Sequence, residues 1–247
     1  MKRAIIIGAT SGIGQAVAKK MLEEGWIVGI AGRRENALET FRATCPDRVY
    51  VQVMDVTQED APLQLMQLIT RMEGMDLFLL SAGTGKENRN LHPDIELETA
   101  ETNVNGFIRM VTAAYRYFKT QNAGHLAVIS SVAGTKGMAS APAYSATKRF
   151  QNTYMDALAQ LIRVEKRNIQ LTDIRPGFVD TALLNSDKKY PMLMQPNRVA
   201  ALIVQALKHR KRATIIDWRY ALLVIIWRFI PQWLWERMRL QVATDKE

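Results

Sequence analysis

Short apolar runs alternate with amphipathic stretches along most of the chain. The amphipathic stretches, such as 15–24, 61–71 and 144–166, repeat at helical spacing. Strands that are apolar throughout and alternate with helices predict a parallel sheet covered on both faces. We therefore expect an α/β fold of the doubly wound class, with helices on both faces of one sheet. The predicted strands are 4–7, 27–30, 49–54, 77–80, 126–129, 171–174 and 213–216.

We expect one domain over residues 1–217 and a C-terminal helical appendage over 218–247. No internal repeat and no linker rich in Gly, Ser or Pro divides the chain, and its 48% apolar and 23% charged residues are ordinary for a globular protein with a full core. The lone Cys45 cannot form an intrachain disulfide, and the first apolar run is too short for a signal peptide. We therefore expect a cytoplasmic protein.

A glycine-rich turn follows the first predicted strand. Glycine allows a backbone to turn tightly, and the helix that opens at Gln15 offers free N–H groups and a partial positive charge. Glycines also serve ordinary strand-to-helix turns, but this position between strand and helix favours a site for a dinucleotide pyrophosphate, as in the Rossmann fold. The residues that we expect to contact the cofactor here are Gly8, Thr10, Ser11, Gly12, Ile13 and Gly14.

The end of the second strand bears on which dinucleotide binds. Enzymes of this architecture that prefer NAD usually place an acid here, on the ribose hydroxyls. In this chain Gly32 takes that place and is followed by Arg33 and Arg34. Without a carboxylate nothing repels a 2′-phosphate, and an arginine can bind one by charge-assisted hydrogen bonds. We therefore predict NADPH over NADH, with Arg33 as the first candidate contact and Arg34 as the second. A solvated basic helix start is the alternative.

Tyr144 and Lys148 are four residues apart in a predicted helix, so their side chains share one face. A free tyrosine has a pKa near ~10 and carries protons poorly at neutral pH. A nearby ammonium favours the phenolate and lowers that pKa. The pair predicts a group that donates or accepts a proton at a carbonyl oxygen, although the spacing also arises by chance.

The GxxxGxG spacing, the Tyr-x-x-x-Lys pair and Ser131, thirteen residues before Tyr144, resemble the short-chain dehydrogenase/reductase family. The family's glycine motif is TGxxxGxG, and Ile7 stands in place of its threonine. The resemblance implies an NADP-dependent oxidoreductase that moves a hydride between a nicotinamide and a CH–OH/C=O group. Ser131 would hydrogen-bond the substrate oxygen, Tyr144 would be the acid/base, and Lys148 would also hold the nicotinamide ribose.

The resemblance also implies a fourth catalytic residue. The family's asparagine, which holds a water in a proton relay to the lysine, aligns with Asn103. Asn105 is the rival, and we choose Asn103 because it matches the Asn-x-x-Gly spacing to Gly106.

Further cofactor contacts follow from the same resemblance. An Asp at the end of the third strand would bind the adenine amino group, although it could equally cap the next helix. Small residues after the fourth strand would let the cofactor pass, where Ser81 replaces a family asparagine. The Pro-Gly motif after the sixth strand would hold the nicotinamide carboxamide. These contacts fall on Asp55, Val56, Ala82, Gly83, Pro176, Gly177, Val179 and Thr181, together with Tyr144 and Lys148.

Segment 182–196 would close over the substrate by the same resemblance. Its apolar residues indicate a partly hydrophobic substrate or the ordinary packing of a lid; they are Leu183, Leu184, Tyr190, Met192, Leu193 and Met194. The substrate class stays open among sugars, steroids, fatty acyl groups, polyketides and lipid-linked intermediates. We predict no metal site.

The C-terminal segment combines tryptophan, arginine and aliphatic residues. Four of the five tryptophans lie in 218–235, but the uninterrupted apolar run is about half the ~20 residues of a membrane span. Tryptophan with flanking arginine is typical of segments that lie in a bilayer interface, and the basic cluster 208–212 precedes it. The alternatives for 218–240 are a protein interface or a lid over the cleft.

The net charge of +9 is compatible with nucleic acid, an anionic membrane or an anionic ligand. No nucleic-acid recognition motif is present, and we predict no nucleic-acid partner. The leading functional hypothesis is an NADPH-linked carbonyl reductase or alcohol dehydrogenase. The alternative is a non-catalytic nucleotide-binding or sensor protein on the same fold. The resemblance also implies a homodimer or homotetramer.

Overall fold

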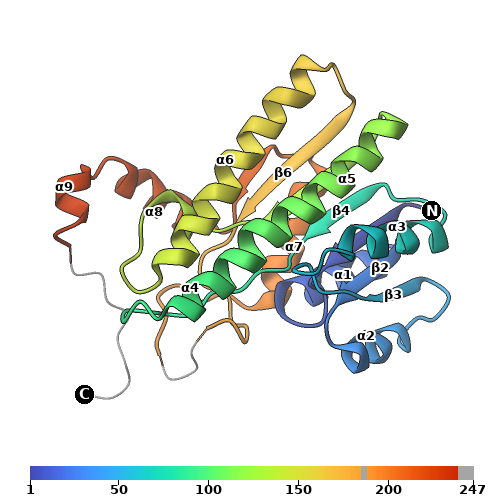
Figure 1. The fold of residues 1–247 in the computed structure, drawn as a ribbon, viewed down its shortest axis with the longest axis horizontal. Helices are drawn as coiled ribbons and strands as arrows, with labels where there is room; N and C mark the ends of the chain where they lie inside the picture. Colours follow the sequence, from blue (N-terminus) through green and yellow to red (C-terminus); the bar gives the residue numbers. More distant parts are fainter. Residues whose placement is uncertain (185–187, 239–247) are drawn as a thin grey trace.

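The computed structural model describes residues 1–184 and 188–238, which form one parallel sheet flanked by helices (Figure 1). The strand order is β3-β2-β1-β4-β5-β6-β7. This confirms the predicted doubly wound sheet and all seven predicted strands. The strands are β1 (Arg3–Ile7), β2 (Ile27–Gly32), β3 (Val49–Val53), β4 (Leu77–Leu80), β5 (Gly124–Ile129), β6 (Ile169–Arg175) and β7 (Ala213–Ile215).

Helices cover both faces of the sheet because the strands are apolar on both sides. Successive side chains of a strand point to opposite faces; in β1, Ala4 and Ile6 pack with one set of helices, and Ile5 and Ile7 with the other. The first set is α1 (Gly12–Glu23), α2 (Glu35–Arg42) and α7 (Pro196–Lys208), and the second is α3 (Ala61–Arg71), α5 (Phe107–Gln121) and α6 (Pro142–Val164).

The strand order reverses between β1 and β4, so their connections diverge to opposite sides. In such sheets this point leaves a crevice beyond the carboxyl ends of the strands, where ligands bind. The glycine-rich turn follows β1 and lies at this edge. The fold therefore brings the predicted cofactor residues and the predicted catalytic residues to one end of the sheet.

The helical stretch that contains Asn103 is divided into three parts. Helix α4 (Pro93–Ala100) continues into a π-helix, η1 (Glu101–Gly106), and then into α5. Asparagine disfavours α-helix interiors, and short π-helical turns occur frequently at functional sites. A 3₁₀ turn, η2 (Val132–Thr135), follows β5.

Helices α5 and α6 run side by side over one face of the sheet (Figure 1). The ring of Phe107, at the start of α5, meets that of Tyr154 on α6 edge-on, with centroids 5.4 Å apart. Helix α6 begins at Pro142, two residues before the predicted start at Tyr144. Proline suits a first helical turn because its missing N–H would have no partner there.

Helices α8 (Trp218–Arg228) and α9 (Gln232–Trp235) lie at the end of the molecule away from α2 (Figure 1). The inner side of α8 presents Tyr220, Val224 and Trp227, which are buried in the same core as α1 and α7. The domain boundary at residue 217 stays a prediction. None of the described helices is both long enough and apolar enough to cross a membrane.

Candidate active site

The glycine-rich turn fits closely against the end of β4. Gly8 has φ +88°, and a Cβ there would lie 2.4 Å from the main-chain nitrogen of Ala82. A Cβ on Gly14 would lie 2.3 Å from the Gly8 carbonyl oxygen. Only glycine tolerates these positions, and Ser11 precedes α1 without a side-chain cap. The first N–H groups of α1 are therefore available to an anion.

The two arginines after β2 take different directions. Arg34 donates from Nη2 to Thr10 Oγ1 at 2.8 Å and to Ser11 Oγ at 2.6 Å. The side chain of Arg33 is 74% exposed, and its Nη1 lies 4.0 Å from Asp55 Oδ2. Arg34, ranked second from the sequence, is thus the one that lies on the glycine-rich turn.

Asp55 does not cap the next helix, because Asp60 holds the N-cap position of α3; the Asp55 side chain closes a local turn instead. Its Oδ1 accepts from the Thr57 N–H at 3.0 Å and from Thr57 Oγ1 at 2.9 Å. Its second oxygen faces Arg33. The neighbouring Val56 is buried, and a Cβ on Gly106 would lie 2.8 Å from its Cγ2. This contact ties the end of β3 to η1.

Ser131 and Tyr144 meet at the carboxyl end of β5. The buried Ser131 hydroxyl accepts from the Ala133 N–H at 3.0 Å and lies 3.4 Å from the Pro176 carbonyl oxygen. Burial raises the pKa of Tyr144, and the hydrogen bond with Ser131 lowers it in part. We expected the ammonium of Lys148 to lower this pKa, but burial has the larger effect. Tyr144 therefore carries its proton at neutral pH.

Lys148 is buried beside Tyr144, with Nζ 5.7 Å from the ring centroid. Its Nζ donates to the Ile129 carbonyl oxygen at 3.2 Å and to Gln151 Oε1 at 3.1 Å. Burial lowers the pKa of Lys148 to about 8, and the negative charge of Asp173 opposes this shift. The lysine is therefore an ammonium at neutral pH that is close to its titration range.

Asn103 is fully buried and joins η1 to the loop after β4. Its Oδ1 accepts from the Thr84 N–H at 2.9 Å, and its Nδ2 donates to the Thr84 carbonyl oxygen at 2.7 Å. Gly85 follows, and a Cβ there would lie 2.2 Å from Cδ2 of Tyr144. Asn105 is exposed and bonds to Glu101 instead. The geometry thus favours Asn103 over its rival.

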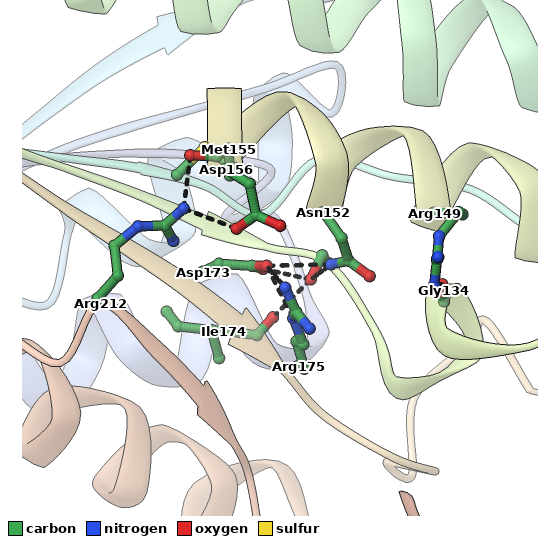
Figure 2. A network of polar contacts seen from close by, with 10 residues as sticks. Gly134, Arg149, Asn152, Met155, Asp156, Asp173, Ile174, Arg175 and Arg212 are labelled. Atoms are coloured by element: carbon green, nitrogen blue, oxygen red, sulfur yellow. Dashed lines mark hydrogen bonds and ion pairs between the residues drawn. The ribbon is translucent and has the colours of Figure 1, made fainter. Parts of the chain in front are cut away.

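Asp173 on β6 is the centre of a buried polar network next to the predicted catalytic residues (Figure 2). The Asp173 carboxylate accepts from Asn152 Nδ2 at 3.0 Å and from Arg175 Nε at 2.8 Å, and it also accepts from the Ser130 hydroxyl. Ser130 adjoins Ser131, and Asn152 lies one turn after Lys148 on α6. A buried carboxylate needs such partners because leaving water is costly.

The Pro-Gly segment lies next to the glycine-rich turn. A Cβ on Gly12 would lie 3.2 Å from the methyl carbon of Thr181. Val179 pairs with Met194, so the two ends of the predicted substrate segment are joined. Residues 185–187 of that segment lie outside the described residues.

Tyr220 of α8 binds both the Pro-Gly segment and the loop that follows it. Its hydroxyl accepts from the Phe178 N–H at 3.0 Å and donates to the Pro191 carbonyl oxygen at 2.8 Å. Gly177 is required here, since a Cβ would lie 2.2 Å from the Tyr220 ring. The inner face of the appendage is therefore part of the scaffold around the predicted nicotinamide site.

Helix α9 contacts the loop that follows Ser131. Trp235 Nε1 donates to the Gly137 carbonyl oxygen at 2.9 Å, and Lys136 Nζ donates to that of Ile230 at 2.9 Å. A hollow of about 780 Å³ lies between this loop and α9. Tyr144 and Ser131 do not line it, so we do not assign the hollow to the reaction.

Sequence reasoning missed Thr84, Gly85, Gln151 and Asp173 as parts of the site. Gln151 had one signal: it lies one turn after Lys148, on the helix face that is turned to the sheet. Asp173 lies within the predicted strand 171–174, and a buried strand position is unusual for an acidic side chain. The other two residues owe their place to contacts that only the fold creates. Within 1–184 and 188–238, no three His, Cys, Asp or Glu side chains are grouped to hold a metal ion.

A doubly wound sheet with a glycine-rich turn at its carboxyl edge is the architecture of many dinucleotide-binding proteins. The family model described as short chain dehydrogenase matches residues 2–191, and the chain belongs to this family of oxidoreductases. An uncharacterized oxidoreductase of Staphylococcus aureus (strain N315) is 30% identical over 87% of this chain and 94% of its own length. Another, from Myxococcus xanthus, is 29% identical over 95% of each chain.

Solved structures share the fold. A short-chain dehydrogenase from Streptomyces avermitilis superposes with a TM-score of 0.80 at 22% identity and covers 92% of each chain. A variant of actinorhodin polyketide ketoreductase with NADPH superposes at 0.76 with 21% identity over 87% of this chain and 95% of that one. At these identities the likeness concerns the fold.

Proposed function

We propose that the chain is an NADPH-dependent oxidoreductase that interconverts a carbonyl and a secondary alcohol. The observation that carries the proposal is the meeting of Ser131, Tyr144 and Lys148 at the carboxyl end of the sheet, beside Asn103. The test is a panel of aldehydes and ketones with purified protein and NADPH, followed by NADPH absorbance. Oxidation of NADPH that needs a carbonyl compound supports the proposal. Tight NADPH binding with no turnover across the panel favours the alternative, a non-catalytic sensor or scaffold.

The chain's residues fit a dinucleotide. Gly8 and Gly14 let the turn after β1 lie close against its neighbours with no side chain projecting, and the start of α1 offers N–H groups to a pyrophosphate. We assign the turn after β1, Asp55, Ala82 and the segment from Pro176 to Thr181 to cofactor contacts. When bound, the cofactor would supply the hydride.

Three side chains would then bind the substrate oxygen or supply and stabilise its proton transfer. Ser131 would donate a hydrogen bond to it, and Tyr144, a protonated phenol at neutral pH, would transfer its proton to it. The Lys148 ammonium would stabilise the negative charge that the tyrosine gains. A preorganised set of donors in a buried site is worth more than the same set in water.

A preference for NADPH over NADH is supported by two features. Gly32 leaves the ribose edge without a carboxylate, and Arg34 already lies on Thr10 and Ser11. Arg33 is 74% exposed, and its guanidinium would reach the same edge by turning away from Asp55, whose Oδ2 lies 4.0 Å from Arg33 Nη1. A 2′-phosphate would meet two guanidinium groups there. Three neighbours of the fold were solved with the phosphorylated cofactor, among them a serine dehydrogenase complexed with NADP+.

An apolar or lipid-linked substrate is the class that we favour. In the segment that leads away from Thr181, Leu183 and Leu193 are 44% and 42% exposed. Burying such side chains against a substrate would contribute about 25 cal/mol for each Å².

We further propose self-association and a peripheral membrane contact. Leu161 and Val164 on α6 are exposed near the C-terminal end of that helix, and they suit the pairing of long helices in a homodimer or homotetramer. The outer side of α8 is also apolar, and we assign it to a lipid surface. Residues 239–240, which the sequence included in that contact, lie outside the described residues.

A further inference from the structure

The amide of Gln151 spans two predicted catalytic groups. Gln151 is 1% exposed and lies one turn after Lys148 on α6. Its Oε1 accepts from Lys148 Nζ at 3.1 Å, and its Nε2 donates to the main-chain carbonyl oxygen of Asn103 at 2.8 Å. An ammonium can only donate and a carbonyl can only accept, so the two neighbours fix the orientation of the amide.

This amide limits what Lys148 can do. An ammonium has three N–H donors. One is bound by the Ile129 carbonyl oxygen and one by Gln151. A Cβ added to Gly83, one of the predicted cofactor residues, would lie 3.4 Å from Nζ. The third donor is left for the cleft, so Gln151 holds the lysine with a single N–H for the cofactor or tyrosine.

The Gln151 amide also lies where a proton relay between Asn103 and Lys148 would need a water. The resemblance implied a water between this asparagine and the lysine. A water can accept one proton and release another, whereas a carboxamide only donates and accepts hydrogen bonds at neutral pH. With Gln151 between them, the Asn103 carbonyl oxygen has a partner that does not relay a proton to Lys148.

We propose that Gln151 is a positioning residue that fixes the Lys148 ammonium and takes the place of a relay water on Asn103. Its catalytic consequence rests on the function proposed above, but its effect on Lys148 does not. The ionisable groups that face Lys148 are Tyr144 on its own helix and Asp173 from β6, while η1 and β5 contribute uncharged groups. A neutral acceptor on Nζ favours the charged form of the lysine.

Two substitutions separate a bridge from ordinary packing. Gln151→Met keeps the volume but removes both polar ends, whereas Gln151→Ala opens room for a water between Nζ and the Asn103 carbonyl oxygen. If Gln151 only filled space, methionine would be the milder change, because alanine leaves a cavity. If Gln151 bridges, alanine is the milder change, because a water restores both hydrogen bonds.

The readout is the pKa of Lys148 itself, measured by NMR titration of protein labelled at lysine Cε, with Lys148→Met to assign the signal. It needs neither cofactor nor turnover. We expect the Lys148 pKa to fall by one unit or more in Gln151→Met and to return toward the native value in Gln151→Ala. Thr147→Val is the matched control, because Thr147 Oγ1 accepts from the Asn103 side chain and lies on the same buried surface. It should leave the Lys148 pKa unchanged.

Thermal unfolding of each variant checks that the fold is kept. An unchanged Lys148 pKa in folded Gln151→Met, or a larger shift in Gln151→Ala than in Gln151→Met, would overturn the proposal. The effect on turnover is a separate arm. Once a substrate is known, the alkaline limb of kcat/KM should move to lower pH in Gln151→Met, and less in Gln151→Ala. A shifted lysine pKa in a protein without turnover would refute the proposed function and leave the bridge standing.

Discussion

Arg34 donates to the Thr10 hydroxyl from both Nε, at 3.2 Å, and Nη2, at 2.8 Å. The second residue after β2 is thereby fixed on the turn after β1. A guanidinium that is already held in place loses less conformational entropy when it binds an anion. The sequence ranked Arg33 first, but the geometry gives Arg34 the preorganised position.

The first prediction concerns these arginines. Arg34→Ala should weaken NADPH binding by about 10- to 100-fold, the ~1.5–3 kcal/mol of hydrogen bonds to a charged group, and leave NADH binding almost unchanged. Arg33→Ala should act in the same direction, and the double variant should lose the preference. Fluorescence titration with both cofactors measures this. Arg42→Ala, an exposed arginine paired with Glu39 on α2, is the control. Equal affinity of the native protein for NADPH and NADH would contradict the prediction.

The second prediction reverses the cofactor preference. Gly32→Asp places a carboxylate at the ribose edge, which should repel a 2′-phosphate and bind the hydroxyls of NADH. A Cβ at this position would lie 2.7 Å from Thr10 Cγ2, the end of a side chain that can turn away. We expect NADPH to bind more weakly and NADH more tightly in the same titrations. A variant that keeps the native preference would show that Gly32 does not set it.

The sequence predicted the sheet because each strand carries its own signal. The run of Ile5, Ile6 and Ile7 is buried on both faces, which is the condition that a parallel sheet imposes. The catalytic motifs are also local, since Tyr144 and Lys148 occupy one helix. Local pattern could not place Gln151 on Asn103, because these residues are 48 positions apart. The direction of Arg34 likewise depends on a turn that lies 24 residues earlier.

The third prediction separates chemistry from binding. Tyr144→Phe should lower turnover by at least about a hundredfold, the low end of what a positioned acid contributes, and keep NADPH binding. Lys148→Ala should impair both, because the lysine faces the cofactor residues as well as Tyr144. Steady-state rates and cofactor titrations test the two effects separately. Near-native turnover in Tyr144→Phe would rule out the proposed acid.

The fourth prediction concerns pH. Burial lowers the pKa of Lys148 to about 8 and raises that of Tyr144. Carbonyl reduction needs Lys148 as an ammonium and Tyr144 as a protonated phenol. This combination therefore predominates below about pH 8. We expect kcat/KM for carbonyl reduction to be level below that pH and to fall above it as Lys148 loses its proton. A profile that stays level to pH 10 would show that the ammonium is not needed.

The fifth prediction concerns the network of Figure 2. Asp173→Ala leaves Arg175 and Asn152 without their buried partner, which typically costs about 3–5 kcal/mol. In a domain of this size that corresponds to a fall in Tm of roughly 6–20 °C. Asp156→Ala, which removes an exposed partner of Arg212, should change Tm little. Calorimetry of the three proteins tests this, and equal Tm values would contradict a structural role for Asp173.

Helix α8 is apolar on two sides, which is unusual for a helix at a protein surface. Tyr220, Val224 and Trp227 face the core, whereas the outer side is 39–82% exposed from α8 through α9. The outer set is Trp218, Leu222, Ile225, Ile226, Phe229, Trp233 and Leu234. Arg228 lies on this surface, and Arg237 stacks on Trp233 at 5.5 Å. The basic cluster 208–212 lies before β7, and α8 begins after β7, so the strand separates the cluster from the outer side of α8. Arg228 and Arg237 are therefore the nearer partners for anionic lipid.

The last prediction is that this outer surface binds a membrane. Removing the chain after Asp217 is a poor test, because it strips Tyr220, Val224 and Trp227 from the core. The better variant is Leu222→Gln with Ile225→Gln and Phe229→Gln, which keeps the inner side. The native protein should float with vesicles, more with anionic lipid because each basic residue near such a surface contributes about 1 kcal/mol. The triple variant should stay in solution. Leu63→Gln, an exposed leucine on α3, should float like the native chain. If the native chain does not float, and the triple variant turns a dimer into a monomer in light scattering, the surface is a subunit interface and the membrane proposal is wrong.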